Sequence, residues 1–212
     1  MNKNHVLKNM RQSIVTTLVL MIICGLIFPV ALSGLGSLLF PHQAGGSLIK
    51  VDGKVVGAEH IGQQFTESYF MKGRPSAVGY NTYNSKAEAE AAGPASGSQN
   101  LAPTNPELAE RVEKDIAAFL AANPDVSKED IPTDLLTASG SGLDPEISPA
   151  SAKVQIPAIA KAAGLSEDQI SAFVKDNTKG KLLGIFGEET VNVLGVNLDI
   201  AEAMGLIGSS EK

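Results

Sequence analysis

The chain has 212 residues, enough for one domain of ordinary size together with a further segment. It carries 17 Lys and Arg against 23 Asp and Glu, a formal net charge of −6 at pH 7, which argues against nucleic acid as a partner. Its single cysteine excludes an internal disulfide framework, so the folded part must be held by a hydrophobic core.

The first predicted element is a transmembrane helix over residues 13–40. No Asp, Glu, Lys or Arg occurs from Gln12 to His42, and a bilayer core requires about 20 apolar residues in a helix. A secretory signal peptide is the alternative, but its apolar stretch would be about 7–15 residues long, with a small-residue cleavage site. Here the apolar character continues through "PVALSGLGSLLF", and Cys24 lacks the preceding small residues of a lipidated cysteine. We therefore expect an uncleaved, single-span anchor.

The orientation of this span follows from the distribution of cations. Lys3, Lys8 and Arg11 precede it with no acid among them, and the next cation is Lys50. The positive-inside rule then predicts a cytoplasmic N-terminus, residues 1–12, and an extracytoplasmic soluble domain, residues 41–212. The sequence thus predicts a single-pass protein of the cell (inner) membrane.

Two patterns follow the span. "SLIKVDGKVVG" predicts a β-hairpin, in which Leu48–Val51 and Lys54–Val56 flank Asp52-Gly53, a dipeptide preferred in type I′ turns. "YNTYNSKAEAEAAGPASGSQN", residues 80–100, has little apolar periodicity and predicts a long loop.

Three helices with recognisable caps are predicted farther along. Asn105 caps "PELAERVEKDIAAFLAA", Ser148 caps "PASAKVQ", and Ser166 with Gln169 forms a capping box for a third. Pro157 should kink or break the second of these helices. "ETVNVLGVNL", residues 189–198, alternates weakly and predicts a strand, followed by a short helix near Ala201. Together these elements predict one α+β domain.

The stretch "DLLTASGSGLDPEISPASA", residues 134–152, is rich in serine, glycine and proline. A nucleophile elbow requires glycine two positions before and two after the serine, and neither Ser139 nor Ser141 satisfies this. Of the three histidines, His5 and His42 flank the predicted span and only His60 lies farther into the exported domain, which disfavours a His-dependent hydrolase. A membrane-anchored hydrolase with a Ser/Lys dyad stays open as an alternative.

Nucleotide and metal motifs are also incomplete. "GSGLDP" fails at the third glycine of a dinucleotide-binding loop, no phosphate-binding loop with the G-x-x-x-x-G-K-[ST] pattern occurs, and no metal-ligand constellation is evident. The same stretch offers geometry instead. Glycines permit tight turns, prolines restrict the backbone, and Asp144 and Ser148 can act as turn and cap residues. We interpret this stretch as an ordered loop or as a rigid polar docking surface. The N-terminus of the helix that follows Ser148 could also attract an anion.

Four long segments in one order then resemble the C chain of the Kdp-type potassium-transporting ATPase. They are "GRPSA" (residues 73–77), "SGSQNLAPTNPEL" (96–108), the serine-rich stretch (134–152) and "GEETVNVLGVNL" (187–198). The resemblance covers nearly the whole chain. It departs at Ser98 and Gln99, where the family commonly has Gly and Ser, and at Glu146, where a histidine is frequent.

The resemblance implies a non-catalytic subunit of an ATP-driven pump for high-affinity potassium uptake. Its partners would be a channel-like A subunit, a P-type ATPase B subunit and a small F subunit. The family's C chain is described as a catalytic chaperone that raises the ATP affinity of the B subunit. The implied candidates for nucleotide or partner contact are Ser96, Gly97, Ser98, Gln99 and Asn100, and the serine-rich loop adds Ser139, Gly140, Ser141, Gly142 and Asp144.

The predicted topology conflicts with direct nucleotide contact, because ATP is cytoplasmic and residues 96–100 are expected outside. We expect no tightly bound cofactor, and ATP contact only within a complex with the B subunit. A coupling of about 1–3 kcal/mol could instead pass through subunit packing. An anchored binding module of another membrane complex is a further alternative.

Overall fold

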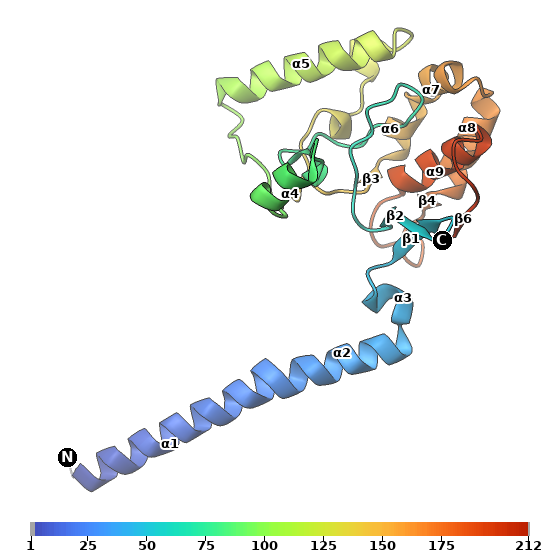
Figure 1. Cartoon of the computed structure of the whole chain (residues 1–212). Helices are drawn as coiled ribbons and strands as arrows, with labels where there is room; N and C mark the ends of the chain where they lie inside the picture. Colours follow the sequence, from blue (N-terminus) through green and yellow to red (C-terminus); the bar gives the residue numbers. More distant parts are fainter. Residues whose placement is uncertain (1–2, 212) are drawn as a thin grey trace. The chain divides into compact units, whose positions relative to one another are not determined.

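The computed structural model describes residues 3–211. The chain divides into two compact units, one within residues 1–47 and the other within residues 48–212. The helices and strands (Figure 1) are, in chain order, α1 Lys3–Ile22, a π-helical turn η1 Ile23–Ile27, α2 Phe28–Leu39, α3 Pro41–Ala44, β1 Leu48–Val51, β2 Lys54–Ala58, η2 Gly79–Asn81, α4 Lys86–Ala92, α5 Pro106–Ala122, η3 Lys128–Asp130, η4 Thr133–Leu135, β3 Glu146–Ile147, α6 Pro149–Lys153, α7 Ile156–Ala163, α8 Glu167–Asp176, β4 Thr178–Lys179, β5 Thr190–Asn192, α9 Val193–Ala203 and β6 Ser210–Glu211.

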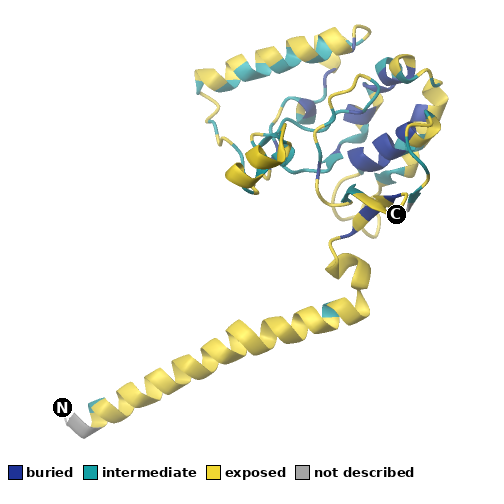
Figure 2. Ribbon diagram, in the orientation of Figure 1, coloured by how far each residue is buried: buried dark blue, intermediate teal, exposed yellow. Residues whose placement is uncertain are grey.

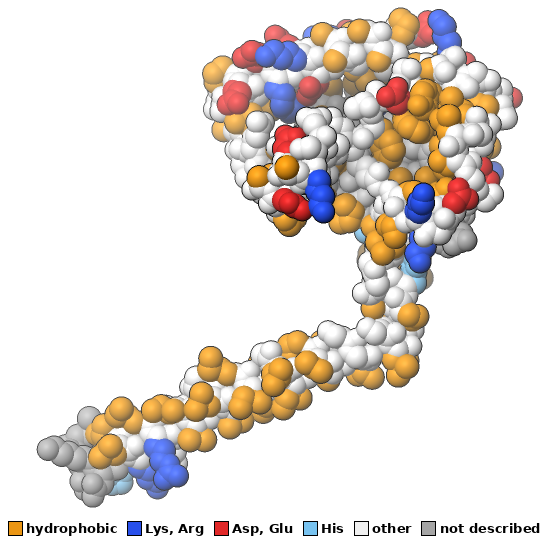
Figure 3. All heavy atoms as spheres, in the orientation of Figure 1, with side chains coloured by type: hydrophobic (Ala, Val, Ile, Leu, Met, Phe, Trp, Pro, Cys, Tyr) orange, Lys and Arg blue, Asp and Glu red, His pale blue; other side chains and the backbone are white. Residues whose placement is uncertain are grey.

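The first unit is dominated by one long helix. Helical geometry runs from α1 through the π-helical turn into α2, and His5–Leu39 is long and apolar enough to be a candidate membrane span. Apolar side chains cover this helix, and its basic side chains lie toward its N-terminal end (Figure 3). Pro29 has no N–H to donate, and the wider π turn just before it, in which Phe28 N–H bonds to the Ile23 carbonyl, adjusts the hydrogen-bond ladder there.

The second unit contains two small antiparallel sheets, with strand orders β2-β1-β6 and β3-β5-β4. The predicted hairpin is confirmed as β1 and β2. Asp52 (φ 49°) and Gly53 (φ 73°) both adopt the positive φ that a type I′ turn requires. Helices surround these short strands, so the predicted α+β fold class is confirmed.

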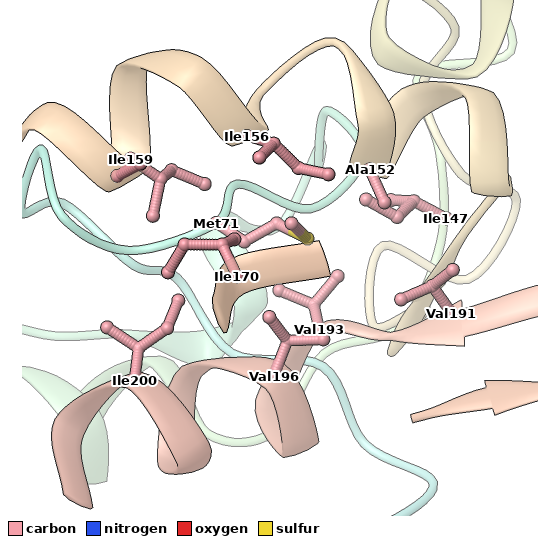
Figure 4. Packing of buried hydrophobic residues seen from close by; sticks show 11 residues of the cluster. Met71, Ile147, Ala152, Ile156, Ile159, Ile170, Val191, Val193, Val196 and Ile200 are labelled. Atoms are coloured by element: carbon pink, nitrogen blue, oxygen red, sulfur yellow. The ribbon is translucent and has the colours of Figure 1, made fainter. Parts of the chain in front are cut away.

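The larger hydrophobic core brings together α6, α7, α8, α9 and the strands β3 and β5. In Figure 4, the side chain of Met71, which belongs to a loop, lies between two groups of residues: Ile156 and Ile159 of α7 on one side, and Val196 and Ile200 of α9 on the other. Figure 2 shows the contrast with the first unit, whose helix is exposed throughout most of its length while α9 is the most deeply buried helix. The second unit is therefore stabilised by its own core.

The predicted helix boundaries are largely confirmed. The side chains of Asn105, Ser148 and Ser166 each accept a hydrogen bond from the first turn of the helix that follows, and Ser166 completes the capping box with Gln169. Pro157 lies in the first turn of α7, where the missing N–H carries no penalty, so the expected break between α6 and α7 is confirmed.

Two predictions were wrong. Residues 189–198 are not one strand, because β5 ends at Asn192, whose side chain caps α9 by accepting a hydrogen bond from Gly195 N–H at 2.8 Å. The segment 80–100 is not loop throughout, since Ser85 caps the helix α4 within it.

Candidate partner-binding site

The two groups of candidate residues lie side by side, although they are 45 positions apart in the sequence. Gly97 N–H donates to the Ser141 carbonyl at 2.8 Å, and the Ser96 hydroxyl donates to the same carbonyl at 3.1 Å. The structure thus joins residues 96–100 and 139–144 into one surface, which we call the paired-loop surface.

Gly142 explains why the two loops can approach so closely. Its φ is +68°, and a Cβ atom there would lie 2.6 Å from Val78 Cγ2 and 2.9 Å from the Gly97 carbonyl oxygen. The Ser139 hydroxyl accepts the Gly142 N–H at 2.8 Å, and the Ser76 hydroxyl donates to the Gly142 carbonyl at 2.7 Å. Only glycine fits this position without displacing the neighbouring chain.

Ser139 and Ser141 differ in their surroundings. Ser139 is 1% exposed, its hydroxyl holds the Gly142 amide, and its own N–H donates to the Pro75 carbonyl at 3.0 Å. Ser141 is exposed, and its hydroxyl accepts the Leu143 N–H at 3.1 Å. Both hydroxyls therefore have a structural role in shaping the loop.

An ion pair fixes the base of the paired-loop surface. Arg74 Nη1 lies 3.0 Å from Asp144 Oδ2, and Arg74 Nη2 donates to the Thr137 carbonyl at 3.4 Å. Asp144 Oδ1 also accepts the Glu146 N–H at 3.1 Å, which confirms the predicted turn role of this residue. The loop before α6 is thus tied to the segment 73–77 by charge as well as by backbone contacts.

Tyr80 closes the same arrangement from the other side. Its hydroxyl donates to the Arg74 carbonyl at 2.7 Å. Burial and the neighbouring Asp144 carboxylate raise the pKa of Tyr80 to about 12, against the opposing effect of Arg74. The phenol therefore stays protonated and keeps its donor function at ordinary pH.

Sequence reasoning missed Arg74, Ser76 and Tyr80 as site residues. Arg74 and Ser76 lie in "GRPSA", a segment that carries the resemblance, but no local pattern shows that it contacts a loop 66 positions away.

A cavity of about 200 Å³ lies beside Arg74, Ser76 and Tyr80 and is lined in part by Lys72, Arg74 and Tyr80. Burial lowers the pKa of Lys72, although Glu67 opposes this, and its ammonium donates to the Phe65 and Glu67 carbonyls.

The outer part of the paired-loop surface is accessible. Gln99 and Asn100 are exposed, and Ser98 bonds locally, its hydroxyl donating to Asn100 Oδ1 at 3.3 Å and accepting the Asn100 N–H at 3.2 Å. Gly140 is exposed, and a Cβ atom added there would meet no other atom within 4 Å. These residues present amide and hydroxyl groups that a partner or a ligand could contact.

The N-terminus of α6, predicted as a position that could attract an anion, holds a carboxylate of the chain itself. Asp134 accepts hydrogen bonds from the Ser148 N–H at 2.8 Å, the Ser148 hydroxyl at 3.0 Å and the Ser151 hydroxyl at 2.5 Å. Burial raises the pKa of Asp134, but the hydrogen bonds from Ser151 and Ser148 outweigh it and hold the pKa below its usual range. The α6 N-terminus is therefore an internal brace.

The charged side chains around the paired-loop surface indicate how well it could bind a nucleotide or a metal ion. A hollow of about 350 Å³ adjoins Gln99, but its cations are paired, Arg111 with Asp115 at 2.6 Å and Lys114 with Glu110 at 2.8 Å. Within residues 3–211, no group of three or more His, Cys, Asp or Glu side chains is placed to hold a metal ion. The surface offers neutral hydrogen-bonding groups to a partner more readily than a cationic cradle to a triphosphate.

The chain is similar to known proteins along almost its whole length. Residues 10–202 match the family described as K⁺-transporting ATPase, c chain. A potassium-transporting ATPase KdpC subunit of Clostridium kluyveri is 59% identical over 94% of this chain and 96% of its own. Those of Clostridioides difficile and Caldanaerobacter subterraneus are 52% and 46% identical, over 95% and 92% of this chain and 100% and 95% of their own. The chain therefore belongs to the KdpC family, the c chains of K⁺-transporting ATPases.

Proposed function

We propose that this chain is a non-catalytic accessory subunit of an ATP-driven potassium-uptake pump and that it supports assembly from the extracytoplasmic side. The partners are a channel-like A subunit, a P-type ATPase B subunit and a small F subunit. The family membership and the candidate span His5–Leu39 support a membrane complex of this kind. The cations before the span support a cytoplasmic N-terminus and an extracytoplasmic second unit.

The observation that carries the assembly role is the direct hydrogen bonding between the loops at Gly97 and Ser141, reinforced by the Arg74–Asp144 ion pair. A surface whose backbone is fixed before a partner arrives loses little conformational entropy on binding. The exposed amide and hydroxyl groups of residues 98–100 then supply polar contacts at the rim of an interface.

We place the catalytic-chaperone role in the same framework. The chain raises the ATP affinity of the B subunit indirectly, by favouring one packing arrangement of the complex. A coupling free energy of about 1–3 kcal/mol corresponds to a 5–150-fold change in affinity, and it requires two sites that bias one conformational equilibrium without direct nucleotide contact. Direct contact between ATP and residues 96–100 is the competing proposal.

Site-specific labelling separates the two. Cys24 is the one cysteine of the chain, so Cys24→Ser with Gln99→Cys provides a unique thiol on an exposed position. We expect a membrane-impermeant maleimide, added outside intact spheroplasts, to label Gln99→Cys. The native Cys24 chain, whose thiol lies within the candidate span, is the control. Labelling only after permeabilisation, or a crosslink from position 99 to the cytoplasmic nucleotide domain of the pump, contradicts the proposal.

Affinity purification of the tagged chain from gently solubilised membranes tests the partners. The A, B and F subunits should be recovered with it. Recovery of a different membrane complex would indicate an anchored module with another partner. Ser139→Ala and Ser141→Ala test the hydrolase alternative, since an enzyme would lose turnover of a small substrate, whereas a subunit would show changes in assembly or transport alone.

A further inference from the structure

The loop between β4 and β5 exposes four large apolar side chains that the proposed assembly role does not use. The exposed fractions are 70% for Leu182, 81% for Leu183, 75% for Ile185 and 62% for Phe186. We call these four residues the apolar tip. A contiguous exposed apolar group of this kind marks a surface that contacts another apolar phase or partner.

The backbone of the apolar tip is closed on itself. Leu182 and Phe186 exchange two hydrogen bonds, at 2.8 and 3.0 Å, and the N–H groups of Gly184 and Ile185 donate to the carbonyls of Lys181 and Leu182 at 3.0 and 3.2 Å. A segment can leave water at low cost only when its backbone polar groups are satisfied internally. The N–H groups of Leu182, Gly184, Ile185 and Phe186 meet this condition.

The turn at the apolar tip places a leucine where the backbone favours other residues. Leu183 has φ +55° and precedes Gly184 at φ +74°. The β1–β2 turn of the same chain has nearly the same pair of angles with Asp52 and Gly53. Asp and Asn tolerate this conformation because their side chains bond locally, whereas leucine has no such compensation. Strained backbone positions of this kind cluster at functional sites, which makes the apolar tip a candidate for one.

The base of the β4–β5 loop is connected through β5 to the β1–β2 hairpin, with which the second unit begins. β1 begins at Leu48, which pairs with Ala58, and the next residue, Glu59, accepts a hydrogen bond from Asn192 Nδ2 at 2.8 Å. Asn192 ends β5, and Thr190 begins it. At a strand rise of roughly 3.3 Å per residue, these two residues lie about 7 Å apart. Thr190 pairs with Lys179 at the base of the loop. Only residues 40–47 separate the candidate span from Leu48, so the length of this connection limits how far β1 can lie from a bilayer that holds the span.

We propose that the apolar tip inserts into the headgroup–acyl boundary of the bilayer as a second membrane contact of the chain. The proposal rests on the membrane anchoring described under the proposed function. The charges around the tip nearly balance, since Lys179 and Lys181 are followed by Glu188 and Glu189, and Lys181 pairs with Glu188 at 3.5 Å. Insertion is therefore driven by apolar surface, to a depth of roughly 5–10 Å, and does not require anionic lipid.

Tryptophan fluorescence gives a direct test, because the chain contains no tryptophan. Phe186→Trp places a unique reporter in the apolar tip of the full-length chain, and Leu206→Trp, at a position 53% exposed, is the matched control. Both chains are reconstituted into phosphatidylcholine liposomes with and without bromine on the acyl chains. We expect several-fold stronger bromine quenching and a blue-shifted emission for Phe186→Trp, and adding Leu183→Asp should reverse both.

Equal quenching of the two reporters, with both chains bound to the liposomes, overturns the proposal. A blue shift that occurs only on assembly with the other pump subunits, without bromine quenching, overturns it in favour of a protein partner. A blue shift that depends on protein concentration alone overturns it in favour of a second copy of the chain. Co-purification of Phe186→Trp with the pump subunits is measured separately, so quenching without co-purification would refute the proposed function and leave the lipid contact standing.

Discussion

The guanidinium of Arg74 lies 3.0 Å from the carboxylate of Asp144, across 70 positions of the sequence. Each side chain is 26% exposed, so the pair is partly shielded from water and from salt. Arg74 also reaches the Thr137 carbonyl, and its own carbonyl accepts the Tyr80 hydroxyl. The segment 73–77 and the loop 134–144 are therefore held as one piece, which sets the geometry of the paired-loop surface.

Removing the charge at Asp144 should weaken this arrangement. Asp144→Asn keeps the shape but leaves Arg74 half-buried without its anion, so we expect the free energy of unfolding to fall by about 1–3 kcal/mol. Chemical denaturation of the purified full chain in detergent, followed by circular dichroism, measures the change. Glu90→Gln is the control, because it breaks a Lys86–Glu90 pair that is 90% and 69% exposed and is worth less than about 1 kcal/mol. Equal losses in the two variants would contradict the role of the Arg74–Asp144 pair.

The glycines of the serine-rich loop offer a matched comparison. Gly142→Ala forces a Cβ against Val78 and the Gly97 carbonyl at a positive φ, whereas Gly140→Ala meets no atom within 4 Å. We expect Gly142→Ala to cost about 1–3 kcal/mol of stability, to speed hydrogen exchange at the Gly97 N–H and to reduce co-purification of the pump subunits. Gly140→Ala should leave all three measurements close to those of the unmodified chain. If the two variants recover the other subunits equally while Gly97 exchanges faster in only one, the paired loops stabilise the fold and are not a docking surface.

A buried asparagine supports the segment that leads to Arg74. Asn197 is 1% exposed, its Oδ1 accepts the Met71 N–H at 2.7 Å and its Nδ2 donates to the Met71 carbonyl at 2.9 Å. Asn197→Ala leaves both backbone groups buried without a partner, so we expect a loss of about 2–5 kcal/mol in thermal or chemical unfolding. Asn105→Ala, which removes only an exposed helix cap, should cost about 1 kcal/mol. A smaller effect at Asn197 than at Asn105 would show that water replaces the lost contacts.

Local features of this fold could be predicted from the sequence because their causes are local. Asp52-Gly53 specifies a turn, and Asn105, Ser148 and Ser166 each cap a helix through contacts two or three residues away. The helix α4 was missed although its signal was present, since Ser85 accepts the Glu88 N–H at 3.2 Å in a Ser-x-x-Glu cap. Its exposed, alanine-rich sequence has no apolar periodicity, so the pattern used to predict helices did not indicate one there.

The remaining features depend on contacts distant in the sequence. "VNVLGVNL" carries a helix-breaking glycine and an alternating pattern, yet α9 forms because its apolar residues are buried on nearly all sides. The serine-rich loop could be identified from composition and residues 96–100 from the family resemblance, but their pairing through Gly97 and Ser141 could not be predicted. Nor could composition show that Arg74 and Tyr80 belong to the same site, since only the folded core sets these distances.

Asp134 should make the free energy of unfolding of the second unit depend on pH in the acidic range. Its pKa is held below the ordinary value of about 3.9 by hydrogen bonds from Ser151 and Ser148, despite burial. A group with a depressed folded pKa contributes stability above the unfolded pKa, and this contribution is lost as pH falls through the folded pKa. We therefore expect the difference in unfolding free energy between the unmodified chain and Asp134→Asn to be constant above about pH 5 and to shrink below about pH 4. Denaturation at a series of pH values measures it, with the exposed Asp125→Asn as control. A difference that does not change between pH 6 and pH 3 would mean that the Asp134 hydrogen bonds contribute equally with a protonated carboxyl, and that the charge at the start of α6 has no part in holding the loop.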